Sequence, residues 1–334
     1  MKKNTILFNL VAVILCGLTT PAAADFCGQN YNDCCEWSLL DGKVTLGADW
    51  LYWKVQQDGV VPGSIVTTTD STVTPSVTTA NKVRPNARWT NGFRVNLGYE
   101  LPCDCWDVNL AYTYMPSHAG VTHFVAAGAN ESFLINNLGV LPLSTFSSKW
   151  SFHGNNLDLD IGRSVAFGEC LTVRPHVGLR STWFSQKVQS FGTVVGVEDA
   201  VTYHRVSVRE KFRGYGVEAG LWTDYKIGGG VSLVGHFGGS VLYSKFKVHN
   251  AGTTGSLTGV LENSTALFSE SDSYHTATPT VDYFVGLQYA DTMCDKIVRA
   301  HIGWEQHVLF DTNRFLSTGN LSTQGLTLGL DVGF

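Results

Sequence analysis

The sequence has little charge and no long apolar segment beyond its first residues. Charged residues make up 15% of the 334-residue chain, whereas soluble domains average roughly 25%. A membrane-spanning helix needs about 20 consecutive apolar residues, and no such run follows residue 24. No broad basic patch is recognisable either, which argues against nucleic acid as a partner. The sequence therefore excludes a helical membrane protein and a nucleic-acid-binding protein.

Aromatic residues, glycines and neutral polar residues are abundant instead, and apolar residues recur at every second position. This period of two is typical of β-strands with one apolar and one polar face. About ten segments show it, and several are longer than the five or six residues usual in a β-sandwich. The predicted strands are 43–54, 93–101, 106–115, 148–166, 171–183, 209–227, 231–247, 281–289, 297–308 and 326–334.

The connections between these strands alternate between long and short. Residues 102–105, 167–170, 228–230 and 291–295 are short, whereas 55–87, 116–147, 184–208, 248–280 and 310–323 are long and rich in Ser, Thr, Gly and Asn. Long outer loops and short periplasmic turns are typical of outer-membrane barrels. Aromatic residues near strand ends favour the same fold, as interface girdles would. These are Trp106, Tyr114, Trp183, Tyr289 and Trp304.

The fold we predict is an all-β transmembrane barrel, antiparallel and up-and-down, with about 10 strands (range 8–12) in a bacterial outer membrane. One strand breaks the alternation, because Trp150 and Phe152 are out of phase with Leu157 and the apolar residues after it. We expect a β-bulge near Gly154 to reconcile the two halves.

The N-terminal residues have the pattern of a signal peptide. Lys2 and Lys3 precede an apolar stretch and an A-x-A site that ends at Ala24. The alternative is a lipoprotein signal with Cys16 as the lipid-carrying residue, which Leu15 disfavours because a small residue is expected there. The predicted organisation is a signal peptide (1–24), a Cys-rich periplasmic segment (25–42) and the barrel (43–334).

The last strand, "TLGLDVGF", is predicted to close the barrel against residues 44–53, because no strand edge can stay unpaired in lipid. Phe334 would face lipid and resembles the signal read by the outer-membrane assembly machinery. We therefore expect removal of Phe334 to impair assembly more than pore properties.

Charged residues on the polar faces of the strands are predicted to line the barrel interior. An Arg or Lys facing lipid at the midplane would cost about 2–4 kcal/mol. Acidic residues outnumber basic ones in this set, which predicts a mild cation preference. Either an open pore or a lumen plugged by paired charges fits these residues. The candidates are Asp49, Arg94, Glu100, Asp107, Asp158, Asp160, Arg174, Arg180, Glu218, Asp224, Asp282, Arg299, Glu305 and Asp331.

Three segments, "GADWLYWKVQQDGV", "CDCWDVNLAYTYMPS" and "GLTLGLDVGF", make the chain similar to a known family. It resembles the pore-forming major outer membrane proteins of the Legionella type, which are also found in chlamydia-related bacteria. The resemblance covers the whole predicted mature chain. It implies an outer-membrane barrel that forms a pore for small solutes.

Seven cysteines remain beyond the signal peptide, and the predicted topology places all of them on the periplasmic side, where disulfides can form. An odd number points to an intermolecular bridge or a free thiol. Bridges within the chain are one possibility. Crosslinks to Cys-rich envelope proteins are the other, and the resemblance favours them. The spacing does not fit a structural zinc site. The cysteines are Cys27, Cys34, Cys35, Cys103, Cys105, Cys170 and Cys294.

No catalytic motif stands out. The sequence lacks G-x-S-x-G and H-E-x-x-H, so we expect no enzyme activity, no metal and no cofactor. The serious alternative to a pore is a surface adhesin, in which the long outer loops bind a host cell over a narrow or plugged lumen. In that case Phe124, Phe133, Leu134 and Phe268 could fold the loops back over the barrel.

Overall fold

A computed structural model describes the chain from Gly42 onward, namely residues 42–69, 77–102, 105–124, 131–135, 139–141, 143–195, 201–258, 261–293, 296–313 and 319–334. The predicted signal peptide and the cysteines at 27, 34 and 35 lie outside these residues. Within the described residues, no helix is long and apolar enough to cross a membrane.

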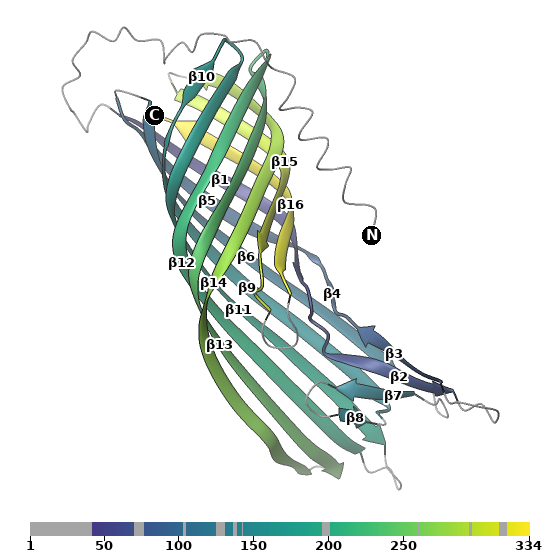
Figure 1. Cartoon of the computed structure of the whole chain (residues 1–334). Coiled ribbons are helices and arrows are strands. Elements are labelled where there is room, and N and C mark those ends of the chain that lie inside the picture. The colour runs from purple at the N-terminus through teal and green to yellow at the C-terminus, as the bar shows by residue number, and fades with distance from the viewer. Residues whose placement is uncertain are drawn as a thin grey trace.

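Ten antiparallel strands form a closed barrel (Figure 1). Each pairs with its neighbour in chain order, and the last pairs with the first, where Trp50 lies opposite Leu328. This confirms the predicted fold class and closing strand. The barrel strands are β1 (Lys43–Gln57), β5 (Trp89–Glu100), β6 (Trp106–Phe124), β9 (Thr145–Arg163), β11 (Leu171–Val195), β12 (Val201–Gly228), β13 (Val231–Thr258), β14 (Leu261–Met293), β15 (Lys296–Leu309) and β16 (Leu321–Gly333).

The two ends of the barrel differ. At one end, called here the short-turn end, the strands are joined by tight turns; the turn at 228–230 consists of three glycines with positive φ, a conformation that other residues rarely adopt. The short strand β10 (Val165–Phe167) extends the pairing at this end, whereas β4 (Asn86–Ala87) pairs with Ala119 and Gly120 of β6 toward the far end. The start of β1 and the end of β16 also lie at the short-turn end, since Lys43 pairs with Glu100 at the end of β5 and Thr45 pairs with Gly333.

At the far end, the segments predicted as loops are largely strand, and this part of the prediction is wrong. β11 to β14 continue as a paired sheet well past the end of β15 (Figure 1). Their alternating Val, Phe and Thr residues favour extended backbone, and each strand supplies hydrogen bonds to the next. A second, four-stranded sheet lies there too. It comprises β2 (Gly63–Thr69), β3 (Val77–Val83), β7 (Glu131–Ile135) and β8 (Gly139–Leu141).

The predicted bulge at Gly154 is absent. β9 pairs with β6 and β11 without a change of register. Trp150 and Phe152 are buried inside the barrel, on the same face as Asp158. The alternation therefore continues unbroken, and what changes along the strand is which face is apolar.

The outer surface of the barrel carries an exposed apolar band, with side chains such as Leu179, Phe237 and Val285. Aromatic residues border it on both sides. The near girdle, at the short-turn end, contains Trp106, Phe167, Tyr225, Tyr289 and Phe334. The far girdle contains Trp50, Tyr52, Trp89, Trp304, Tyr215 and Tyr243.

Beyond the far girdle apolar side chains fill most of the interior, and a buried polar pair, Gln186 and Glu210, lies among them at 3.1 Å. Phe184 and Phe212 stack with their ring centroids 4.5 Å apart, and Phe246 stacks on Tyr274 at 4.9 Å. Together with Phe152 these side chains form a continuous row across β9, β11, β12, β13 and β14, which we call the aromatic layer. The layer belongs to a larger buried cluster that also includes Leu51, Val188 and Leu242.

Candidate functional site: the charged lumen

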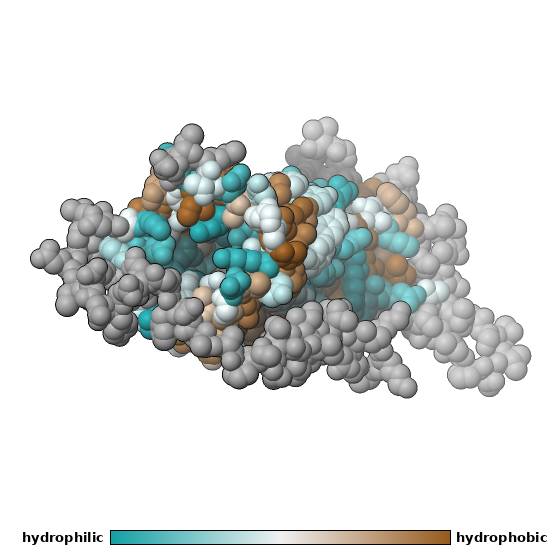
Figure 2. All heavy atoms as spheres, turned by 90° about the horizontal axis from the view of Figure 1, so that it is seen from above, coloured by the Kyte–Doolittle hydropathy of each residue, from teal (hydrophilic) through white to brown (hydrophobic). Residues whose placement is uncertain are grey.

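The lumen between the short-turn end and the aromatic layer holds a cavity of about 670 Å³. In the view onto the short-turn end, hydrophilic residues surround a hollow and hydrophobic residues lie outside it (Figure 2). Alternate residues of each strand face the lumen, and all fourteen charged residues predicted to do so lie on the cavity wall. These are Asp49, Arg94, Glu100, Asp107, Asp158, Asp160, Arg174, Arg180, Glu218, Asp224, Asp282, Arg299, Glu305 and Asp331.

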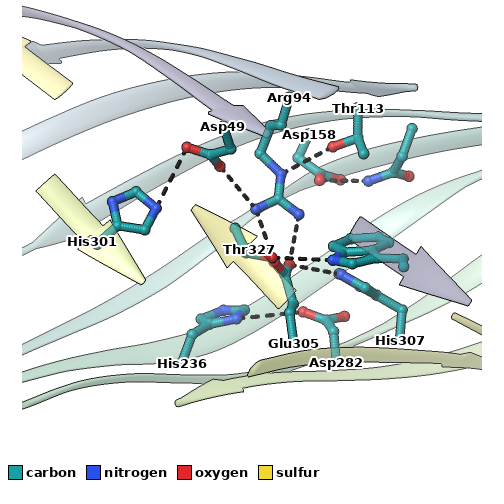
Figure 3. Close-up of polar contacts among 12 residues, drawn as sticks. Asp49, Arg94, Thr113, Asp158, His236, Asp282, His301, Glu305, His307 and Thr327 are labelled. Atoms are coloured by element: carbon teal, nitrogen blue, oxygen red, sulfur yellow. Dashed lines mark hydrogen bonds and ion pairs between the residues drawn. The ribbon is translucent and has the colours of Figure 1, made fainter. Parts of the chain in front are cut away.

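One ion-pair cluster centres on Arg94 of β5 (Figure 3). Its guanidinium lies 3.3 Å from a carboxylate oxygen of Asp49 on β1 and 2.6 Å from one of Glu305 on β15. Both carboxylates are buried. Because β16 lies between β1 and β15, the arginine spans part of the lumen and connects three different strands.

Glu305 is held by further hydrogen bonds. The hydroxyl of Thr327 donates to it at 2.8 Å, and His307 Nε2 lies 2.8 Å from its other oxygen. Trp53 Nε1 in turn donates to Thr327 at 3.1 Å. A carboxylate with this many partners has a fixed orientation, so the wall near Glu305 is rigid.

A second cluster centres on Arg180 of β11, which faces three carboxylates. The distances are 2.7 Å to Asp158, 2.8 Å to Glu218 and 2.6 Å to Asp282. Asp158 and Glu218 lie on the neighbouring strands β9 and β12, whereas Asp282 lies on β14, with β12 and β13 between it and Arg180. His236 approaches Asp282 at 3.6 Å. This cluster therefore also reaches across the lumen.

A third cluster lies closer to the short-turn end. Arg174 contacts both oxygens of Asp107 and lies 2.6 Å from Asp160. The side chain passes directly over Gly162, where an added Cβ would lie 2.5 Å from the guanidinium carbon. Gly162 therefore makes room for the arginine, and a larger residue there would displace it.

The three clusters leave the lumen negatively charged. Arg94, Arg174 and Arg180 face seven carboxylates in total, so each guanidinium is outnumbered. Of the remaining four candidates, Glu100, Asp224 and Asp331 are acidic and Arg299 is basic. An excess of carboxylates attracts cations into the cavity and repels anions.

Apolar side chains close the far end of the cavity. Its wall there includes Met115, Phe152, Phe184, Leu309 and Leu321, four of which are buried at 4% exposure or less. The polar lumen thus meets the aromatic layer at the level of the far girdle.

Several lumen residues were missed in the sequence analysis. The ring of Trp222 stacks on that of His236 at 4.4 Å, and both line the cavity with Thr327. The sequence does indicate this position for Trp222, because it is separated by an even number of residues from Glu218 and Asp224 and therefore shares their face of the strand. The prediction failed because an aromatic residue near a strand end is expected to face lipid.

The aromatic residues predicted to fold loops over the barrel have different positions. Phe133 is fully buried and stacks on Phe146 at 5.2 Å, and Phe268 packs partly buried against the same core. Phe124 is 72% exposed. The side chain of Leu134 lies outside the described part of the chain.

Two of the seven predicted disulfide cysteines are described. Cys105 lies in the turn before β6 and Cys170 in the turn before β11, both at the short-turn end. Cys170 is exposed and free. The other five lie outside the described residues, so the disulfide pattern stays a prediction.

Comparison with solved structures finds outer-membrane barrels. They include the outer membrane protease OmpT of Escherichia coli (9% identity, 87% of this chain and 96% of that chain, TM-score 0.39). A major outer membrane protein of Thermus thermophilus shares 15% identity over 88% and 100% of the two chains, with a TM-score of 0.32. Ail of Yersinia pestis shares 13% over 88% and 99%, with a TM-score of 0.25. Structural similarities with TM-scores below 0.5 give no information about activity.

No curated protein matches the sequence. The family described as Legionella pneumophila major outer membrane protein precursor matches residues 37–333, which is nearly the entire barrel and the end of the preceding segment. With the closed ten-stranded barrel and its apolar outer band, this places the protein in the bacterial outer membrane, with the short-turn end toward the periplasm. The chain therefore belongs to the family of the Legionella pneumophila major outer membrane protein.

Proposed function

We propose that the protein is a narrow, cation-preferring pore for small polar solutes. The observation that carries the proposal is the charged cavity, which lies at the depth of the lipid-facing band. Ionisable groups within a membrane protein are costly and mark ion or solute pathways. A barrel that served only as an anchor would be more stable with an apolar or tightly packed interior.

The ion-pair clusters and the aromatic layer restrict this pore. Arg94 and Arg180 each reach carboxylates on strands that are not their neighbours, which narrows the lumen at mid-depth. Passage beyond the cavity requires side chains such as Phe152 and Phe184 to move aside. We therefore expect brief openings with small conductance rather than a permanently open channel.

Liposome swelling with sugars of graded size tests the pore directly. Vesicles that contain the full-length refolded protein should swell in the smallest sugars and progressively less in larger ones. Planar bilayers should show single-channel steps and a reversal potential on the cation side. If vesicles with correctly folded barrel swell no faster than protein-free vesicles and no steps occur, the proposal is wrong.

Binding by the outer surface is a second candidate function. The observation that favours it is the extension of β11 to β14, which presents a hydrogen-bonded sheet outside the membrane rather than flexible loops. A rigid scaffold lowers the entropy lost on binding. Shortening the β13–β14 hairpin by residues 250–270 should abolish host-cell attachment while conductance persists. If attachment is unchanged, the extension is not the adhesive surface.

Disulfide crosslinks to Cys-rich envelope proteins are a further part of the proposal. Cys170 supports it, because an exposed thiol in a periplasmic turn is accessible to a partner thiol. Non-reducing electrophoresis of intact envelopes, with thiol exchange blocked, should show this protein in high-mass complexes. A monomer-sized band would contradict crosslinking.

A further inference from the structure

Six cations cover the outward face of β11, β12 and β13 just beyond the far girdle. This outer cationic patch escaped the sequence analysis because its members are spaced along three strands. Their neighbours Phe184, Phe212 and Phe246 point inward, so the cations point outward. The patch consists of Lys187, Arg209, Lys211, Arg213, Lys245 and Lys247.

The patch places like charges directly opposite one another. In the strand registers, Lys187 pairs with Arg209, Lys211 with Lys247, and Arg213 with Lys245. Such like-charge pairs destabilise a sheet. None of the six forms an ion pair with any residue in the described ranges. The protein therefore carries a local repulsion that a bound anion would relieve.

The patch also contains a surface pocket of about 240 Å³. Lys187, Arg209 and Lys211 line it, together with the hydroxyl-bearing Ser151 and Ser185 and with His153. Cross-strand pairing brings these residues together, since Ser185 lies opposite both Lys211 and His153. Two lysines, one arginine and two hydroxyls can donate hydrogen bonds to several oxygens of one phosphate group.

The depth of the patch in the membrane identifies the ligand. Arg213 lies two positions outward of the far-girdle residue Tyr215 on β12, and Lys245 lies two positions outward of Tyr243 on β13, or about 7 Å along each strand. The aromatic side chains of a girdle lie at the headgroup level. Cations one step farther out are thus at the height of the lipid phosphates, whereas a polysaccharide ligand would require cations at the tip of the extension.

We propose that the outer cationic patch binds the phosphate groups of the phosphorylated glycolipid in the outer leaflet, with one phosphate in the pocket at Lys187, Arg209 and Lys211. This lipid is bound on the outside of the barrel. The inference is therefore independent of whether the lumen conducts.

The test uses the full-length protein in detergent and measures binding of bisphosphorylated lipid A by native mass spectrometry. In the triple variant Lys187→Gln/Arg209→Gln/Lys211→Gln, binding should weaken about 100-fold, since each cation near a membrane surface changes the affinity about fivefold. The matched control is Lys82→Gln/Arg84→Gln/Arg88→Gln, which removes three exposed cations elsewhere at the same end of the barrel. The control should bind like the wild type.

Separate arms distinguish the source of the phosphate. Lipid A without its phosphates should bind the wild type as weakly as bisphosphorylated lipid A binds the triple variant. Inorganic phosphate should compete with bisphosphorylated lipid A only at high concentration. Without lipid, the triple variant should be no less resistant to urea than the wild type, because like-charge pairs have been removed. Equal affinity of wild type and triple variant for bisphosphorylated lipid A would overturn the proposal, as would tight binding of the dephosphorylated lipid. Heparin binding by the patch without lipid A binding would also overturn it.

Discussion

Replacement of Arg180 by glutamine tests the charge of the lumen most directly. Arg180 faces Asp158, Glu218 and Asp282 at 2.6–2.8 Å, and its side chain is only 10% exposed. Glutamine keeps an amide donor but loses the charge. The cluster then changes from one cation against three carboxylates to three carboxylates alone.

The size of the effect on selectivity follows from Coulomb's law. A permeating ion at roughly 6 Å from the guanidinium interacts with it by about 0.7 kcal/mol in a water-like dielectric. Loss of the arginine favours a cation by this amount and disfavours an anion by the same amount. The ratio of cation to anion permeability should therefore rise by up to about tenfold, or about 1.4 kcal/mol. The effect should shrink at 1 M salt, where the Debye length is only about 3 Å.

The same substitution should lower stability. Removing one partner of a buried ion pair costs about 3–5 kcal/mol, because it leaves uncompensated charge. Part of this cost is recovered here, since the cavity side of the cluster is open to solvent and ions. Urea titration in lipid vesicles should thus show a lower free energy of unfolding, and the loss should be smaller at low pH, where carboxylates are protonated.

The assay is the reversal potential of a planar bilayer across a tenfold KCl gradient at low salt. Lys149→Gln is the matched control, because Lys149 is exposed and alternates with the buried Trp150, so its charge lies outside the lumen. The control should leave the reversal potential unchanged. A shift of Arg180→Gln toward anion selectivity, or no shift at all while the control behaves as expected, would refute the assignment of this cluster to the conducting path.

Three further predictions concern other parts of the molecule. Phe212→Ala should lengthen the channel openings, because it removes a buried ring from the centre of the aromatic layer. It should also lower the free energy of unfolding in urea titrations by about 3–5 kcal/mol. Openings of unchanged length would show that the aromatic layer does not limit conduction. Leu221→Arg, in the lipid-facing band between Tyr215 and Tyr225, should destabilise the barrel in vesicles by about 2–4 kcal/mol, whereas the uncharged Leu221→Ile should not; equal urea midpoints would contradict that placement. Cys170→Ser should reduce the high-mass complexes in non-reducing electrophoresis, and an unchanged pattern would assign the crosslinks to other cysteines.

Much of the barrel could be predicted from the sequence because lipid imposes a simple rule. Within the band, apolar side chains face outward and charged ones inward, so strand phase alone assigned residues such as Asp282 and Arg299 to the lumen. The pairing of these charges could not be predicted in this way. Arg180 and Asp282 are 102 residues apart, and their contact depends on barrel curvature and on the strands between them.

The rule failed where its physical cause ends. Beyond the far girdle, water replaces lipid outside the barrel, so the cations face outward and apolar residues pack inside; the charged side chain that stays inside, Glu210, is paired with Gln186. On β12 the last outward aromatic residue is Tyr215, and the first inward phenylalanine of the aromatic layer is Phe212. Between them lies Arg213, the first exposed cation. The apparent slip at Trp150 and Phe152 was this same change on β9 and not a bulge.

This reversal locates the outer boundary of the membrane from two sides. On the outer surface, the far girdle contains the last lipid-facing aromatic side chains. In the interior, the aromatic layer contains the first apolar side chains that are buried away from water. On β13 the girdle residue is Tyr243 and the residue of the aromatic layer is Phe246, and a cation, Lys245, again lies between them. Arg213 and Lys245 also face each other across β12 and β13. The cations of the outer patch therefore begin at the boundary itself, the level at which phosphate groups of the outer leaflet are available to bind them.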